Sequence, residues 1–331
     1  MRYKCNIDKG SLDACEPFDS RKRGVKMREK NNISLFSYMG SKAPMAERIA
    51  DLLDDTKACY CEPFAGSAAV FLNKLPSSEE ILNDKDIGIF ALWTEAKEDI
   101  ERLFAEYFKI PQCKEIFSSF LLKKRAGYPG VSLHEKAVME LYIIEESFNS
   151  ARLNFRACDR SKLENQIFEI EEYINERLQN VVIKNDDALD ILRKNLNNED
   201  MCIYLDPPYL DSLISRPLYF ERLGDEEQIN MLSMIQNCCK CSILLSGYRG
   251  NQENGFLYDQ YLNVEHGWAC YVVDDRQQRC CSNNAECMIR GARKRFSTEV
   301  VWCNYVPDAY ALGKLASFDI AMTEKEAKGL A

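Results

Sequence analysis

The chain has 331 residues, enough for one large domain with an insertion or for two domains. Hydrophobic residues make up 46% of it and charged residues 29%, as in soluble globular proteins, and no apolar run reaches membrane-spanning length. The formal net charge of -9 argues against a protein that coats nucleic acid through its overall charge, but leaves open a nucleic-acid enzyme with local basic clusters.

Residues 1–30 are polar and mixed in charge, which predicts a flexible lead-in without a secretion signal. The chain contains 15 cysteines but only 2 histidines, and the cysteines do not form the paired Cys-x-x-Cys knuckles of a zinc site. We therefore expect a reduced, cytoplasmic protein without a bound metal, with structural zinc as the alternative.

The stretch Leu35–Lys42 comes first after this lead-in, and Ser41 and Pro44 predict the start of an amphipathic helix. Gly40 lets the backbone approach a ligand closely, and Lys42 near the helix start is suited to a phosphate or carboxylate. Many helices begin in this way, so the stretch is a weak signal by itself.

Residues Ala58–Leu72 predict a short strand, a turn of small residues at Ala65, Gly66 and Ser67, and then a helix. Such a turn presents backbone N–H groups at a helix N-terminus to an anionic group such as a carboxylate. It is not a nucleotide P-loop, because no Gly-Lys-Ser/Thr follows, and it lacks the spacing of a dinucleotide fingerprint. A generic turn between strand and helix is the alternative.

A second short strand, within Glu79–Asp86, ends in acidic residues. An acid at the end of the second strand commonly accepts hydrogen bonds from a ribose diol. Asp84 stands at this place, with Asp86 as the alternative. Together with the preceding turn, this acid favours a cofactor that contains a nucleoside.

From about Ile87 to Gln179, apolar residues recur at helical spacing, which predicts a helical insertion between two strands of the sheet. Its most irregular part, Ser147–Arg156, alternates Asn, Ser and Arg with apolar residues. This segment is suited to contacts with bases or phosphates, and a solvated helix end explains it equally well.

The sheet resumes after Asn180 with a strand that ends at Asp186 and Asp187. Lys240–Ser246 is a later buried strand, and Val272–Tyr305 resembles a β-ribbon. This ribbon carries Arg276 and Arg279 and the basic cluster Arg290, Arg293, Lys294 and Arg295. Such a cluster is more often a solvated face than a phosphate site.

The strand Ile203–Leu205 leads into the sequence Asp206-Pro-Pro-Tyr209. Pro207 and Pro208 cannot continue a sheet, so the chain leaves the strand at its carboxyl end, where open α/β sheets bind ligands. The Asp206 carboxylate and the Pro207 carbonyl can accept both N–H bonds of an exocyclic amine, while Tyr209 stacks on its ring. A strand-terminating turn with a packed tyrosine is the alternative.

In this order, the motifs resemble those of the Dam-like (class alpha) DNA adenine-N6 methyltransferase family, between about Phe36 and Tyr305. The matching segments are the cofactor motif Tyr38–Lys42, the glycine motif Glu62–Leu72, the ribose-binding Asn83-Asp84, the adenine-proximal Asp187-Ala188, the catalytic Asp206–Tyr209 and the closing strand Thr298–Tyr305. The chain departs from the family at Ala68, which replaces the second glycine of its motif. It also lacks the family's Asn-Gly turn near Phe148 and Asn149.

The resemblance implies an α/β fold with a Rossmann-like, S-adenosylmethionine-dependent methyltransferase sheet and a mainly helical inserted recognition domain. The catalytic domain is expected over 31–90 and 180–306, the insert over 91–179, the polar lead-in over 1–30 and a tail over 307–331. The implied reaction transfers a methyl group from S-adenosylmethionine to adenine N6 in double-stranded DNA, with the target base flipped out of the duplex and no metal required. The alternatives are a cytosine-N4 or RNA-adenine enzyme and a catalytically silent DNA-binding protein. A partner restriction endonuclease is a further expectation.

The resemblance and the motifs together assign three groups of site residues. The expected catalytic residues are Asp206, Pro207, Pro208 and Tyr209. The expected cofactor-binding residues are Tyr38, Gly40, Lys42, Phe64, Ala65, Gly66, Ser67, Asp84, Asp187 and Asp206. The expected DNA-binding residues are Asn149, Arg152, Asn154 and Arg156 in the insert, with Arg290, Arg293, Lys294 and Arg295 in the ribbon.

Overall fold

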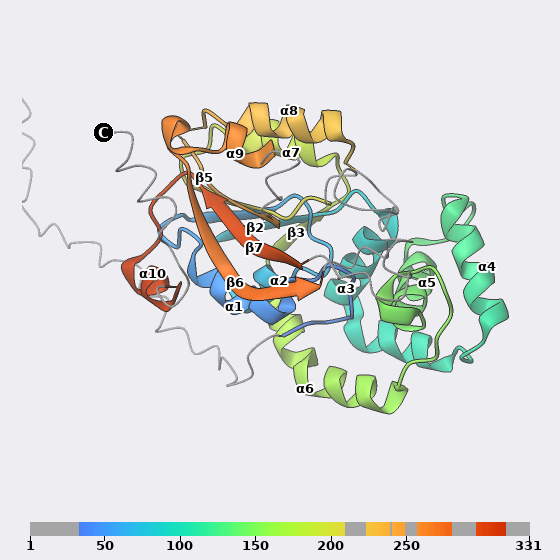
Figure 1. Cartoon of the computed structure of the whole chain (residues 1–331). Helices are drawn as coiled ribbons and strands as arrows, with labels where there is room; N and C mark the ends of the chain where they lie inside the picture. The colour runs from blue at the N-terminus through green and yellow to red at the C-terminus, as the bar shows by residue number, and fades with distance from the viewer. Residues whose placement is uncertain (1–32, 209–222, 239, 249–256, 280–295, 316–331) are drawn as a thin grey trace, which may run out of the picture. The chain divides into compact units, whose positions relative to one another are not determined.

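The computed structural model describes residues 33–208, 223–238, 240–248, 257–279 and 296–315. The chain divides into Met1–Lys30 and Asn31–Ala331, and all described residues belong to the second unit. This unit is built around a seven-stranded sheet with helices on both faces (Figure 1).

The strands follow one another in the spatial order β3-β2-β1-β4-β5-β7-β6. Their bounds are β1 Cys59–Glu62, β2 Glu79–Asn83, β3 Val181–Lys184, β4 Met201–Leu205, β5 Ser242–Tyr248, β6 Ala269–Arg279 and β7 Phe296–Cys303. Strands β1 to β5 are parallel, whereas β7 runs antiparallel to both β5 and β6. The predicted Rossmann-like sheet and the pairing of a terminal β-ribbon are confirmed.

The helices before the insert are η2 Ala43–Met45, α1 Ala46–Asp51 and α2 Ala69–Asn73. Between β2 and β3 lie α3 Ile87–Lys109, α4 Lys114–Arg125, α5 Leu133–Glu145, η3 Phe148–Ser150 and α6 Arg160–Leu178. The remaining helices are α7 Ala188–Asn195, α8 Asp225–Ile235, α9 Leu257–Tyr261, η6 Val264–His266 and α10 Ala309–Leu315.

Each face of the sheet has its own apolar core, because successive side chains of a strand point to opposite faces. On β4, Cys202 and Tyr204 pack into the core that includes α1, α2 and α3, whereas Ile203 and Leu205 pack against α7, α8 and α9. Figure 1 shows α7, α8 and α9 together above the sheet and α1 and α2 below it. Burial on both faces explains why this strand reads as a continuous apolar run.

Local signals fix where the insert helices begin. The Asp86 carboxylate accepts a hydrogen bond from the Gly88 N–H, which caps α3, and Ser132 forms a capping box with Glu135 at the start of α5. Helix α3 packs along α5, and Gly88 permits this approach, since a Cβ there would lie 2.2 Å from Oε2 of Glu140. The caps and this glycine bring two acidic residues, Asp86 and Glu140, close together.

The helices and the metal-ligating side chains bear on two further classes of protein, those that span membranes and those that bind metals. Among the residues with described placement, no helix is long and apolar enough to cross a membrane. In the same residues, no group of three or more His, Cys, Asp or Glu side chains is arranged to hold a metal ion.

Candidate active site

The order of the sheet reverses between β1 and β4, where one chain connection runs to β2 and the other to β5. Ligands of open α/β sheets bind at the carboxyl ends of the strands beside such a reversal. A pocket of about 930 Å³, open to solvent, lies there. It is lined by every residue that the sequence assigned to the cofactor: Tyr38, Gly40, Lys42, Phe64, Ala65, Gly66, Ser67, Asp84, Asp187 and Asp206.

The turn after β1 forms one wall of this pocket. Gly66 has a φ of 48° and lies against Tyr38, whose Cε1 would be 3.1 Å from a Cβ at this position. Both the left-handed backbone and the close ring favour glycine here. Trp93 of α3 donates a hydrogen bond of 2.8 Å to the Gly66 carbonyl, and the hydroxyls of Ser41 and Ser67 lie 2.9 Å apart.

Ala68, two residues after Gly66, also has a left-handed backbone conformation, with a φ of 46° and a ψ of 37°. This is the position at which the family pattern has a second glycine, and the backbone keeps the conformation that glycine adopts without strain. The departure from the pattern therefore changes the residue and leaves the turn in place.

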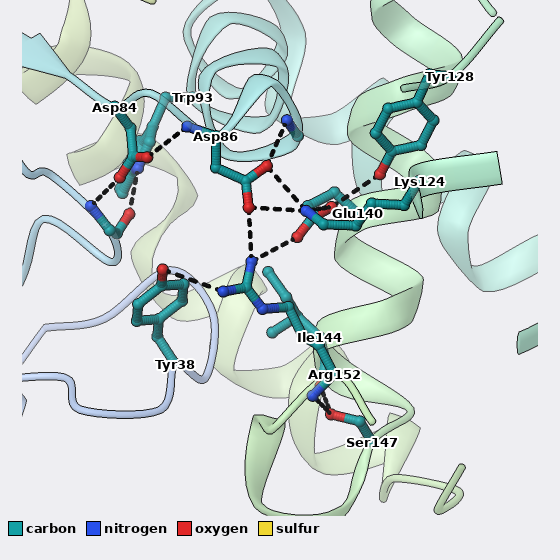
Figure 2. A network of polar contacts seen from close by, with 12 residues as sticks. Tyr38, Asp84, Asp86, Trp93, Lys124, Tyr128, Glu140, Ile144, Ser147 and Arg152 are labelled. Atoms are coloured by element: carbon teal, nitrogen blue, oxygen red, sulfur yellow. Dashed lines mark hydrogen bonds and ion pairs between the residues drawn. The ribbon is translucent and has the colours of Figure 1, made fainter. Parts of the chain in front are cut away.

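Asp84 follows β2, and its carboxylate contacts both the turn after β1 and the start of α3. Its Oδ2 accepts the N–H of Gly66 at 2.8 Å, and its Oδ1 accepts the N–H of Asp86 at 2.9 Å (Figure 2). Burial, together with the negative charge of Asp86, raises the pKa of Asp84 to about 6. The carboxylate is thus held rigidly, and each oxygen retains a second lone pair for a ligand hydroxyl.

Asp206 follows β4 on the other side of the pocket. Its Oδ1 accepts a hydrogen bond of 2.7 Å from the Lys42 ammonium and one of 3.1 Å from the Ser246 hydroxyl. The Ser246 hydroxyl also lies 2.9 Å from that of Tyr204. Lys42 is only 4% exposed and has a second carboxylate, Glu299, at 3.5 Å. These contacts fix the orientation of the Asp206 carboxylate at the pocket wall.

Comparison with known proteins shows which family has these residues. The model of the D12 class N6 adenine-specific DNA methyltransferase family matches residues 38–246, which contain all the residues that line the pocket. The chain belongs to this family. A relative, the Type II methyltransferase M.CviBI of Paramecium bursaria Chlorella virus NC1A, is 22% identical over 250 residues, covering 70% of this chain and 88% of that protein.

Membership of this family identifies the reaction. The protein is an adenine-N6 DNA methyltransferase, its substrate is DNA, and S-adenosylmethionine is the methyl donor that the family uses. The match favours adenine in DNA over cytosine N4 or RNA adenine. The roles of individual residues stay predictions, and the remaining geometry of the methyltransferase bears on them.

Pro208 of the expected catalytic motif is held by a residue that the sequence did not indicate. Gln228 of α8 donates a hydrogen bond of 2.8 Å to the Pro208 carbonyl, and Tyr258 donates one of 2.6 Å to Oε1 of Gln228. Gln228 is fully buried. The fourth residue of the motif, Tyr209, lies outside the described residues.

Glu62 is another pocket residue without a role in the sequence-based site. It ends β1, is almost fully buried and accepts a hydrogen bond of 2.5 Å from the Tyr60 hydroxyl. Burial raises its pKa to about 8. Its place in the motif Glu62-Pro-Phe-Ala-Gly-Ser67 was visible, but nothing in the sequence showed that its side chain would be buried.

Asp187 caps α7 by accepting the N–H of Leu189 at 2.9 Å, and its other oxygen pairs with Lys85 at 3.0 Å. The side chain is half-buried at the rim of the pocket, next to Ala188. Its predicted place near the cofactor adenine is compatible with this position and stays a prediction.

The segment Ser147–Arg156 differs from the expectation at one residue. Asn149, Asn154 and Arg156 are exposed, as residues that contact DNA should be. Arg152 is only 3% exposed, because its guanidinium is ion-paired with Asp86 and Glu140 in the interior. Its expected contact with DNA is therefore not compatible with this arrangement. The ribbon residues Arg290, Arg293, Lys294 and Arg295 lie outside the described residues.

Proposed function

We propose that the pocket binds S-adenosylmethionine across the ends of β1, β2 and β4, and that Asp206 holds the target adenine. The pocket lies at the carboxyl ends of the parallel strands, where open α/β sheets bind ligands. Asp84 offers a fixed carboxylate for the ribose hydroxyls, and the small residues Ala65, Gly66 and Ser67 line the pocket beside it. When bound, S-adenosylmethionine supplies an electrophilic methyl group.

The nucleophile in the reaction is a poor one, because the N6 lone pair of adenine is delocalised into the ring. We propose that Asp206 and the Pro207 carbonyl accept the two N–H bonds and so favour a nitrogen whose lone pair is free to react. Among the described residues, Lys42 and Ser246 donate hydrogen bonds to this carboxylate, and both fall on Oδ1, so we assign Oδ2 to the adenine. Preorganised acceptors of this kind stabilise charge that develops in the transition state.

Adenine inside a duplex cannot reach such a pocket, so the target base must be flipped out of the stack. Stacking of Tyr209 on the base remains part of the proposal. For the DNA contacts we propose Asn149, Asn154 and Arg156, with the ribbon cluster from Arg290 to Arg295 on phosphates. A partner restriction endonuclease stays a prediction.

The observation that carries this proposal is the Asp206 carboxylate, fixed by Lys42 at 2.7 Å in the pocket that Asp84 also lines. The test is methyl transfer from labelled S-adenosylmethionine to DNA, with the modified bases located by sequencing. Asp206→Ala should abolish the transfer of label to adenine. The matched control is Asp200→Ala, since Asp200 is an exposed acid at the opposite end of β4 and should leave transfer unchanged. Full transfer by Asp206→Ala would contradict the assignment.

A further inference from the structure

The recognition loop, which we define as Ser147–Arg156, has two faces with different chemistry. Its outward face carries exposed apolar and polar side chains, among them Phe148, which is 52% exposed, with Arg156 stacked 5.4 Å from its ring centroid. Its inward face carries Ser147, Ser150 and Arg152, all buried. A loop that reads DNA with its outward face needs something on its inward face to hold it.

The Arg152 side chain makes that connection (Figure 2). Nη1 donates to Oδ2 of Asp86 at 2.9 Å and to Oε1 of Glu140 at 3.0 Å, and Nη2 donates to the Tyr38 hydroxyl at 3.4 Å. Lys124 completes the cluster by donating to both Asp86 oxygens at 2.8 Å and to Oε2 of Glu140 at 2.6 Å. Two cations and two carboxylates thus meet where α3, α4, α5 and the loop converge.

The backbone of the loop also depends on this anchor. Asn149, Ser150 and Arg152 all have positive φ, between 52° and 55°, a region that side chains other than glycine rarely adopt. Such conformations persist only where surrounding contacts enforce them. Here the Ser147 hydroxyl accepts the Arg152 N–H at 3.1 Å, and the buried guanidinium fixes the residue from its other end.

The same cluster is continuous with the cofactor side of the pocket. Asp86 donates its N–H to Asp84, and Asp84 accepts the N–H of Gly66. Tyr38 contacts both Gly66 and Arg152, whose guanidinium carbon lies 5.1 Å from the ring centroid of Tyr38. Arg152 itself lines the pocket. The recognition loop is therefore joined to the cofactor site by one run of direct contacts.

We infer that Arg152 is a positioning residue for target recognition: it holds the recognition loop on the Asp86–Glu140 carboxylate pair, so that the outward face meets DNA in one conformation. Arg152 reads no base and binds no phosphate. Loss of its planar fork should let the loop relax from its strained backbone, and discrimination between DNA sequences should fall. This inference rests on the proposed role of the loop in reading DNA.

The experiment compares Arg152→Lys and Arg152→Met with the wild-type enzyme on two duplexes. One is the target that sequencing of methylated DNA identifies, and the other differs from it by one base pair outside the methylated adenine. We expect the ratio of kcat/KM values for the two duplexes to fall about tenfold or more in Arg152→Met, as for loss of one good base contact. Arg152→Lys should recover part of this ratio, because lysine keeps the charge without the fork.

Two further measurements separate positioning from the other roles of a buried arginine. The slope of log Kd against log salt should stay unchanged in both variants, whereas loss of a phosphate contact would lower it by about 1. Arg177→Met is the matched control, since Arg177 is equally buried and pairs with Glu80 in another part of the fold. It should lower the melting temperature comparably and leave the discrimination ratio intact.

A lower salt slope, or an equal loss of discrimination in Arg177→Met, would overturn the inference. Asn149→Ala and Asn154→Ala distinguish its failure from failure of the proposed reader. If these variants lose discrimination and the Arg152 variants do not, the inference alone is wrong. If neither set changes discrimination, the loop is not the reader and both proposals fail.

Discussion

The strand ends of the pocket and the recognition loop both present polar side chains to one site, but they are held in different ways. Asp84 and Asp206 stand directly after β2 and β4, so the sheet places their backbone and local hydrogen bonds orient their carboxylates. The recognition loop keeps a strained backbone that depends on ion pairs with Asp86 and Glu140, which are 66 and 12 residues away from Arg152. The first region follows from the order of strands, and the second from a buried charge cluster.

If this contrast is correct, breaking the charge cluster should cost stability, and the effect should be the largest of those considered. Glu140→Gln removes the charge of one of the two carboxylates that pair with Lys124 and Arg152, at a position with no exposed surface. Removing one partner of a buried ion pair typically costs about 3–5 kcal/mol. We expect a loss of that size in the free energy of unfolding, measured by urea denaturation. A loss below about 1 kcal/mol would show that the cluster does not hold the insert.

At the strand ends, the corresponding change should act on catalysis. Lys42→Met removes the ammonium that orients Asp206, and we expect kcat to fall about 10²–10³-fold, as when a preorganised polar contact is lost. Lys74→Met is the control, because Lys74 is a similarly buried, ion-paired lysine that binds Glu80 at the start of β2. Steady-state methyl transfer should show a normal kcat for the control. An unchanged kcat in Lys42→Met would show that catalysis does not depend on the contact between Lys42 and Asp206.

The pH dependence of stability and of cofactor affinity tests Asp84, at the end of β2, and leaves the helical insert unaltered. The pKa of Asp84 is raised from 3.8 to about 6, so the folded protein binds its proton more tightly than the unfolded chain, and this group's contribution to stability falls as pH rises from about 4 to 6. Only the ionised carboxylate can accept the hydrogen bonds of a ribose diol, so cofactor affinity should rise as the pH increases. Measured by calorimetry, it should fall about tenfold per pH unit below 6 and level off above it.

Asp84→Asn is the control for this pH profile, since it keeps the shape of the side chain and removes its titration. Its cofactor affinity should be weaker at neutral pH and flat between pH 5 and 7. A profile that keeps its slope in Asp84→Asn would assign the titration to another group, of which Glu62 is the buried candidate in the pocket.

The smallest expected effect concerns the turn beside the strand ends. Ala68→Gly relieves a left-handed alanine but removes a buried methyl group, and these terms are each about 1 kcal/mol and opposite in sign. We expect the free energy of unfolding to change by less than about 1 kcal/mol, measured by urea denaturation. A loss above about 2 kcal/mol would show that the Ala68 side chain, and not its backbone, secures the turn.

The sequence was sufficient for the strand ends, because their signals are local. A buried run followed by Asp206 and two prolines can only leave the sheet at its carboxyl end, and the same reasoning places Asp84 after β2. It was not sufficient for the partners of these residues. Ser246 is 40 residues from Asp206, and Gln228 reaches Pro208 from helix α8.

The directions of the side chains in the recognition loop could not be predicted from the sequence. Arginine and asparagine alternate along it with apolar residues, which predicted DNA contacts for Arg152 and its neighbours alike. The direction of each side chain is set by positive φ angles at Asn149 and Ser150 and by carboxylates on other helices. No local pattern contains that information, so the inward turn of Arg152 became visible only in the folded chain.

The central claim is that Asp84 serves the cofactor and Asp206 serves the adenine, within one pocket. Single-turnover methyl transfer, titrated with S-adenosylmethionine, measures both roles in one assay on Asp84→Asn and Asp206→Ala. Asp84→Asn should raise the half-saturating cofactor concentration about 10–100-fold, equivalent to losing a charged hydrogen bond of about 1.5–3 kcal/mol, and keep most of the plateau rate. Asp206→Ala should lower the plateau at least about 10²-fold and leave half-saturation within about threefold. If both variants change the same parameter, the division of roles between the two carboxylates is wrong.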